Sequence, residues 1–188
     1  MPNHSKKASP TPTWASPSME PKRKFKYILS LGTGDNAIPT WLVKSASRPG
    51  FTVTSPAEHQ FLGHTFKFPG RVKWEPMDIV LMDPINPEVA SKVLGIIEDA
   101  GYVLPSKWGV GEEWKKTLSK KKFSENNLGA ISISTLDSEG QKVEEWQLFN
   151  VQITKVNYGE LDYNSEELLT VTLGIVFDYA KHTVHNEG

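Results

Sequence analysis

The sequence predicts a mainly β protein, either an antiparallel β-barrel or two packed β-sheets, with one flanking α-helix and long loops. Three observations support this fold class. About seven or eight segments alternate apolar and polar residues with the period of a β-strand. Most are separated by hairpin-length turns, which favours antiparallel pairing. Only one segment carries a convincing helical stripe.

The longest alternation lies near the C-terminus, from Leu169 to Tyr179, where every odd position is large and apolar. At about 3.3 Å per residue, one strand of this length would span roughly 35 Å. A bare edge of that length would recruit other chains. We therefore expect this strand either inside a barrel or sandwich or paired with another subunit.

Composition limits the possible classes of protein. The chain has 188 residues, of which 38% are hydrophobic, a net charge of −1 and no cysteine. One domain is the expectation for this length. Without cysteine, disulfides, a thiol nucleophile and thiolate metal sites are excluded. The apolar runs are too short for a membrane span or a signal peptide, which predicts production in a cytosol without membrane insertion.

The charge is unevenly distributed. Residues 1–26 contain six basic residues and one acidic residue, which leaves 15 basic and 21 acidic residues in the rest of the chain. Residues 1–23 are rich in Pro, Ser, Thr and Lys, a composition that predicts a flexible arm. The expected division is this arm, a β domain over residues 24–181 and a C-terminal tail over residues 182–188.

Several short strands are predicted before the helix. Their alternation is interrupted by glycine and proline, as at the Pro69–Gly70 turn. The predicted strands are Phe25–Leu31, Thr40–Val43, Phe51–Thr54, His64–Phe68, Val72–Trp74 and Met77–Met82, with a long hairpin loop between the second and third.

The helix is predicted over residues 87–100. Asn86 is a favourable N-cap, Pro87 suits the first turn and Gly101 suits the position after the last turn. One apolar stripe follows the helical period, so one face should pack on a sheet. The stripe comprises Val89, Val93, Ile96, Ile97 and Ala100.

Strands resume after the helix. A strand over Leu128–Leu136 is followed by a turn at Asp137–Gly140 and a returning strand over Val143–Thr154. The alternation changes phase near Phe149–Asn150, which indicates a bulge or a strand buried on both faces.

Motifs for catalysis or cofactor binding are weak. Gly32–Ala37 matches the dinucleotide pattern G-x-G-x-x-A, yet Pro39 and a strand follow where a helix is required. His182 and His185 are interpreted as surface histidines at the C-terminus rather than metal ligands. Glu144 and Glu145 are adjacent in a strand and should point to opposite faces. We expect no catalytic residue, cofactor or metal.

Residues 102–127 form a long segment with tryptophans and a basic cluster. Such a combination can bind nucleic acid through phosphate contacts and stacking. The acidic body favours a solvated or protein-contacting loop instead. The cluster consists of Lys115, Lys116, Lys120, Lys121 and Lys122.

Residues 24–180 resemble the tail tube proteins of contractile-tailed bacteriophages, a family related to the tube proteins of type VI secretion. The segments that match most closely are Gly159–Asp162, the acidic turn after it, Leu169–Leu173 and Phe177–Tyr179. The helix, the early Phe66–Gly70 segment and the strands over 146–156 occur in the expected order.

The resemblance implies a structural virion protein whose hexameric rings stack into the inner tube of a contractile tail, the channel for DNA ejection. Adjacent sheets would join around the channel, and long inter-subunit loops would reach the next ring. Its implied partners are other copies of itself, the tail sheath protein, the baseplate and tail terminator proteins, and DNA in transit. Its place is the virion, with assembly in the host cytoplasm.

Two sets of surface residues become candidates for assembly. Polar strand positions suit a water-filled lumen or a subunit interface, and an acidic lining would repel DNA. These positions are Ser132, Ser134, Thr170, Thr172 and Asp178. The polar face of the helix would face the sheath. That face consists of Glu88, Ser91, Lys92 and Glu98.

Three alternatives remain open. The tube could belong to a type VI or other contractile injection system and carry effectors rather than DNA. The chain could be a monomeric barrel that binds a small ligand in its mouth. An oxidoreductase built on Gly32–Ala37 is the third.

Overall fold

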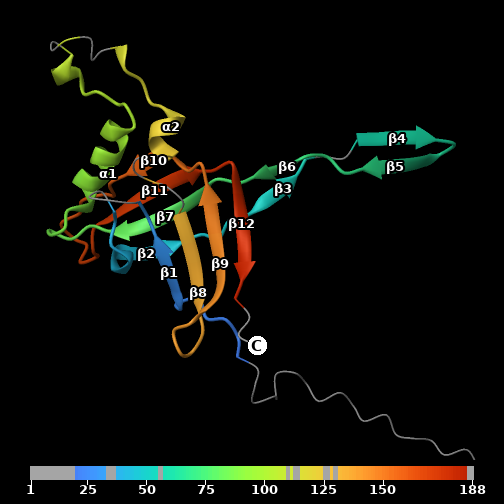
Figure 1. Cartoon of the computed structure of the whole chain (residues 1–188), viewed down its shortest axis with the longest axis horizontal. Helices are drawn as coiled ribbons and strands as arrows, with labels where there is room; N and C mark the ends of the chain where they lie inside the picture. Colours follow the sequence, from blue (N-terminus) through green and yellow to red (C-terminus); the bar gives the residue numbers. More distant parts are fainter. Residues whose placement is uncertain are drawn as a thin grey trace, which may run out of the picture.

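The fold was analysed in a computed structural model that describes residues 20–32, 37–54, 57–108, 111, 115–124, 128 and 131–185. Two antiparallel four-stranded sheets form the body, which confirms the mainly β fold class (Figure 1). The described strands pack as two open sheets and do not close into a barrel.

Sheet I has the strand order β1-β8-β9-β12. Its strands are β1 (Tyr27–Ser30), β8 (Ile131–Leu136), β9 (Lys142–Phe149) and β12 (Tyr179–Val184). Sheet II has the order β10-β11-β7-β2. Its strands are β10 (Gln152–Asn157), β11 (Thr170–Val176), β7 (Met77–Met82) and β2 (Val43–Ala46).

The remaining strands make two small ladders in the excursion between β2 and β7. β3 (Phe51–Val53) pairs with β6 (Val72–Trp74), and β4 (Ala57–Phe61) pairs with β5 (His64–Phe68). We call residues 51–74 the hairpin arm. It extends to the right of the body in Figure 1.

One hydrophobic core lies between the sheets. Alternation places one face of each strand inside, so the odd residues of β11 pack opposite β8 and β9 residues such as Ile131 and Leu148, all fully buried. The described residues also contain three short helical segments. These are η3 (Thr40–Leu42), η4 (Pro105–Lys107) and α2 (Lys120–Lys122).

Helix α1 spans Val89–Asp99 and begins two residues later than predicted. Its first turn is capped by Asp83 rather than Asn86, since the Val89 N–H donates to Asp83 Oδ1 at 3.0 Å. The predicted stripe is otherwise confirmed, because Val89, Val93 and Ile96 are fully buried.

The C-terminal end of α1 requires a glycine, as predicted. Gly101 has φ +116°, and a Cβ at this position would lie 2.3 Å from the carbonyl oxygen of Thr117. We expect Gly101→Ala to lower the free energy of unfolding by about 2–3 kcal/mol, measured by urea denaturation. Gly140→Ala is the matched control, because Gly140 has φ +83° but open space around it. Equal losses in the two variants would contradict a steric cause.

The long C-terminal strand was predicted wrongly. β11 ends at Val176, and the chain crosses to sheet I before β12 begins at Tyr179. The Asp178 N–H donates to the carbonyl oxygen of Phe149, which fixes the crossing. Phe177, which lies in the break, is buried at 8% exposure. The apolar alternation of the sequence therefore continues through the break and gives no sign of it.

A second crossing replaces the predicted bulge. β9 and β10 lie in different sheets, and Asn150 between them has φ +55°. The change of phase at residues 149–150 therefore marks a change of sheet. Likewise, residues 40–42 form η3 instead of a strand, and β2 begins only at Val43.

Candidate assembly interface

The hairpin arm is the largest projection of the described chain. Its root is attached to the core by aromatic contacts, with Phe51 against Trp74 at 5.4 Å and Trp74 against Phe177 at 5.7 Å between ring centroids. At its tip, Leu62 and Gly63 both have positive φ, the geometry of a two-residue hairpin turn.

Apolar side chains of the arm are exposed to an unusual degree. Leu62 is 83% and Phe61 is 60% exposed. Further exposed side chains along the arm are Phe51, Val53, Phe66, Phe68 and Val72. An isolated two-stranded hairpin is marginally stable in water, and a continuous apolar surface marks an interaction site. The arm is therefore suited to binding a partner surface.

The sheets have free edges. β1 and β12 border sheet I, while β10 and β2 border sheet II, and each pairs with only one strand among the described residues. Unpaired edge strands present backbone donors and acceptors that can extend a sheet. Both sheets can therefore continue into another subunit.

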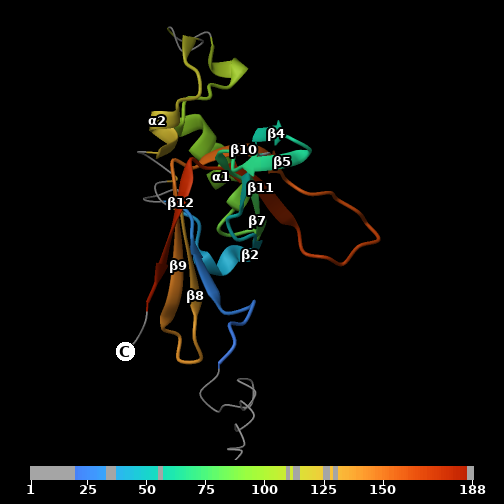
Figure 2. The same cartoon turned by 90° about the vertical axis from the view of Figure 1, so that its right-hand side faces the viewer.

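We call residues 158–169, which join β10 to β11, the acidic loop. It contains four carboxylates and no basic residue. The loop projects at the right in Figure 2. Its exposed apolar side chains include Leu161, Tyr163 and Leu168, which are 89%, 109% and 72% exposed. Local hydrogen bonds shape it, since Asp162 Oδ1 accepts from the Asn164 N–H at 2.9 Å.

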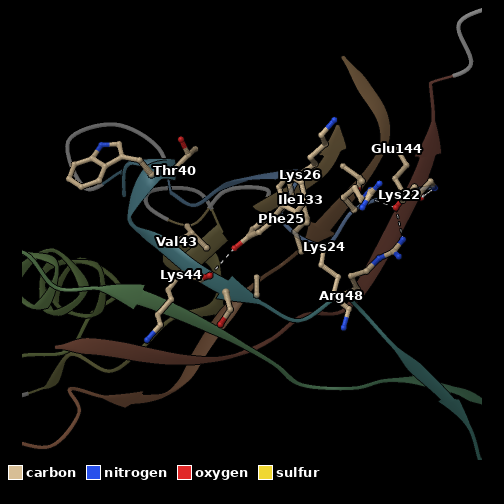
Figure 3. Close-up of a pocket in the computed structure, with 16 residues that line it drawn as sticks. Lys22, Lys24, Phe25, Lys26, Thr40, Val43, Lys44, Arg48, Ile133 and Glu144 are labelled. Atoms are coloured by element: carbon tan, nitrogen blue, oxygen red, sulfur yellow. Dashed lines mark hydrogen bonds and ion pairs between the residues drawn. The ribbon is translucent and has the colours of Figure 1, made fainter. Parts of the chain in front are cut away.

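Glu144 is the main buried charge. It lies on the inner face of sheet I, toward the end that sheet II leaves open, and is 2% exposed. Its carboxylate accepts hydrogen bonds from Lys22, from Arg48 at 2.5 Å and from the Thr135 hydroxyl at 3.1 Å. His182 Nε2 lies 3.3 Å away. Figure 3 shows Lys22 and Arg48 converging on it.

These partners determine the pKa of Glu144. Burial alone would raise it, but hydrogen bonds from Lys22, His182 and Thr135, with the charge of Arg48, lower it to about 2. The carboxylate is therefore ionised at neutral pH. It joins the N-terminal segment, the β2–β3 connection and two strands of sheet I.

Beside this cluster lies a cavity of about 870 Å³, bordered by the β1 and β2 edges. We call it the basic cavity. Among its lining residues six are basic and one, Glu144, is acidic. The basic residues are Lys22, Arg23, Lys24, Lys26, Lys44 and Arg48. Phe25 and Trp41 line it too and are 75% and 61% exposed.

The predicted lumen residues divide between the outer faces of the two sheets. Ser132 and Ser134 lie on sheet I, whereas Thr170 and Thr172 lie on sheet II. Ser134 is 2% exposed and donates a hydrogen bond to Glu145 at 3.3 Å. Asp178 is exposed and accepts hydrogen bonds from Lys120 at 2.5 Å and Asn150 at 2.7 Å.

The polar face of α1 is partly engaged. Glu88 and Ser91 are exposed. Lys92 donates to the carbonyl oxygen of Ala37 at 3.2 Å, and Glu98 forms an ion pair with Lys107 at 3.5 Å. Two of the four predicted residues therefore contact other parts of the chain.

Other predicted motifs have mixed outcomes. Residues 33–36 of the glycine-rich segment lie outside the described residues. His182 belongs to β12 and stacks on Trp146 at 4.4 Å, so it does not lie in a loose tail.

Among the basic cluster, Lys120–Lys122 form α2. Glu144 and Glu145 point to opposite faces, as predicted.

No described helix has the length and hydropathy needed to cross a membrane. Over the same residues, no group of three or more His, Asp or Glu side chains is placed to hold a metal ion.

The sequence missed the Glu144 cluster. In the sequence, Glu144 stands out only as half of an adjacent glutamate pair. Its partners are distant in sequence, with Lys22 at 122 and Arg48 at 96 residues' separation. The only available signal was an acidic residue at an inward position of a strand.

The chain is similar to known proteins in part of its sequence and in its fold. Residues 104–181 match the family described as T4-like virus tail tube protein gp19. A search of curated proteins finds no match.

Solved structures match over most of the chain. A chain of the PVC sheath-tube complex, from an extracellular contractile injection system in its extended state, has a TM-score of 0.62 at 17% identity and covers 93% of this chain and 99% of its own. Chains from the anti-feeding prophage baseplate and tube-terminating cap have TM-scores of 0.60 and 0.59 at 13% and 17% identity. They cover 88% and 89% of this chain, and 97% and 93% of their own.

The family match includes β8 to β11 and most of the loop before them. The structural matches extend the shared fold beyond the family match, to between 88% and 93% of the chain. The resemblance to tail tube proteins is thus confirmed for residues 104–181, and the solved structures share the fold over most of the chain.

Proposed function

We propose that this chain is the tube subunit of a contractile particle, in which identical copies form rings and the rings stack into a hollow tube. The observation that carries the proposal is the hairpin arm, an exposed apolar projection on a fold whose two sheets both end in free edges. A closed assembly uses such edges without aggregation. The role is structural rather than catalytic.

Sheet II is proposed to continue from subunit to subunit as the wall of the channel. Its edge strands β10 and β2 would become neighbours across each interface. Thr170 and Thr172 would then face the lumen, while α1 and sheet I, with Ser132, would lie outside. Ser91 of α1 and Glu88, the residue directly before α1, are exposed and would face a surrounding sheath.

The hairpin arm is proposed to reach the next ring. The arm is continuous with β2 and β7 of sheet II, so a force on its tip would be transmitted directly to the channel wall. Burying its phenylalanines on another subunit would stabilise both the arm and the stack.

Two cargoes are compatible with this architecture. The family match to a virus tail tube protein supports the tail of a phage virion. For that case we propose six subunits per ring, ejection of DNA through the tube, sheath, baseplate and terminator proteins as partners, and assembly in the host cytoplasm. The PVC and anti-feeding prophage matches support a second candidate, an injection system that carries protein. Nuclease-protected DNA in purified particles would identify the first; its absence together with enclosed protein would identify the second.

Electron microscopy tests the proposal as a whole. Purified full-length protein should form rings at moderate concentration and stacked tubes at high concentration, with a mass by light scattering that increases in steps of whole rings. A protein that remains monomeric at every concentration, alone and with sheath and baseplate components, and that binds a small apolar compound would contradict it.

A further inference from the structure

The acidic loop and the basic cavity are complementary surfaces on one chain. We infer that the acidic loop of one subunit docks into the basic cavity of its neighbour and thereby sets the order of subunits around the ring. This inference rests on the proposed tube function and names the contact that joins two copies within a ring.

Part of the positive charge of the basic cavity is not neutralised by the residues that the structure describes. Lys22 and Arg48 are paired with Glu144, and Lys26 donates to the carbonyl oxygen of Asp137 at 3.0 Å. Lys24 and Lys44 have no ion pair among the described residues. The cavity therefore presents two available ammonium groups beside exposed aromatic rings.

The acidic loop presents the opposite chemistry. Glu160, Glu166 and Glu167 form no ion pair within the described chain, and the carboxylate of Asp162 accepts hydrogen bonds there only from Asn164. Apolar side chains alternate with these carboxylates, and Tyr163 is fully exposed. A surface that pairs its carboxylates with lysines and its rings with Phe25 and Trp41 would bury both kinds of group.

The register of sheet II places the two surfaces correctly. One row of paired residues crosses the sheet from the β10 edge to the β2 edge, and it consists of Asn157, Thr172, Val80 and Ser45. The acidic loop begins directly after Asn157. η3 and the start of β2, which line the basic cavity, lie at the same end of the sheet.

The two surfaces therefore lie at opposite edges but at the same end of sheet II. When sheet II is extended by adding β10 of a second copy beside β2, the second copy's acidic loop approaches the first copy's Trp41 and Lys44. Such head-to-tail contact uses two different surfaces, and it closes into a ring when the rotation permits.

Cysteine cross-linking tests the contact, because the natural chain has no cysteine. A full-length variant with Lys44→Cys and Glu166→Cys, treated with a short bismaleimide, should give a ladder of covalent oligomers up to the ring size. A mixture of the two single variants should give dimers only. The control pair, Lys44→Cys with Glu139→Cys in the exposed β8–β9 turn, should give no ladder.

Charge reversal provides the second measurement. Lys24→Glu with Lys44→Glu should raise the concentration required for assembly at least about tenfold, as should Glu166→Lys with Glu167→Lys. Combining all four substitutions should restore assembly, which a merely misfolded variant would not do. The same lysine variant should leave the thermal midpoint of the monomer unchanged.

The outcomes separate this inference from the proposed function. Tubes that form normally in both reversed variants, with no ladder from the Lys44–Glu166 pair, would overturn the docking contact and leave the tube function intact. Binding of a DNA oligonucleotide at the lysines without any ladder would overturn it as well. Absence of rings and tubes in the unaltered protein under every condition would overturn both.

Discussion

Replacing Phe61 and Leu62 at the tip of the hairpin arm with glutamate is expected to abolish tubes while leaving single rings. The two side chains are 60% and 83% exposed in the isolated chain, so they contribute little to its own stability. Burying two carboxylates in an apolar contact without basic partners costs several kcal/mol of stacking free energy. This cost recurs at every subunit of a ring. Negative-stain microscopy and sedimentation velocity would measure the loss of stacking.

Ile85→Glu is the matched control for the tip variant. Ile85 is fully exposed, like Leu62, but lies outside the arm in the turn before α1. It should leave both rings and tubes unchanged. Tubes of normal length from the tip variant would show that the arm does not connect rings, and a lowered thermal midpoint would show that the arm supports the fold of its own chain.

Glu144→Gln is expected to produce the largest loss of stability among single substitutions outside the apolar core. The variant leaves the charges of Lys22 and Arg48 beside a neutral amide that cannot compensate them. From the pKa of about 2, against an ordinary value of 4.5, the ionised carboxylate contributes about 3 kcal/mol at neutral pH. The thermal midpoint should fall by on the order of 10 °C.

The acid dependence of Glu144 has a definite sign. A carboxylate whose pKa is lower in the folded state stabilises the protein above its unfolded pKa, and the contribution is lost as pH falls toward its folded pKa. The window is therefore pH 4.5 down to about 2. The original protein should have a higher free energy of unfolding than Glu144→Gln at pH 7. At pH 3 this difference should be smaller by about 2 kcal/mol, as measured by denaturant unfolding at the two pH values.

Glu139→Gln is the control for this substitution, because Glu139 is exposed in the β8–β9 turn. Its stability should match the original protein at both pH values. If the free energies of unfolding of the original protein and Glu144→Gln differ by the same amount at pH 7 and pH 3, the ionised Glu144 carboxylate is not the source of the stability. Stability that the Glu144→Gln variant itself loses at low pH would come from other carboxylates. One of these is Glu145, whose pKa is lowered by its hydrogen bond from Lys142.

Individual elements of the fold were predictable where the pattern is local. The apolar stripe of α1 identified its buried face, since helical periodicity acts within a few turns. Its first residue was misplaced because Asp83, six residues away, supplies the capping oxygen. The turn at Asp137–Gly140 follows from turn chemistry alone, and Asp137 Oδ1 accepts the Glu139 and Gln141 N–H groups as such turns require.

The sequence by itself determined the class of this protein, an antiparallel β fold with one helix, because strand and helix periods are properties of neighbouring residues. Tertiary structure alone decided which strands share a sheet. Leu169–Tyr179 has one uninterrupted alternation, yet the chain changes sheets at Phe177–Asp178, because β11 pairs with β7 before the break and β12 pairs with β9 after it. The Glu144 cluster has the same origin, since a long-range ion pair leaves no periodic signal in the chain.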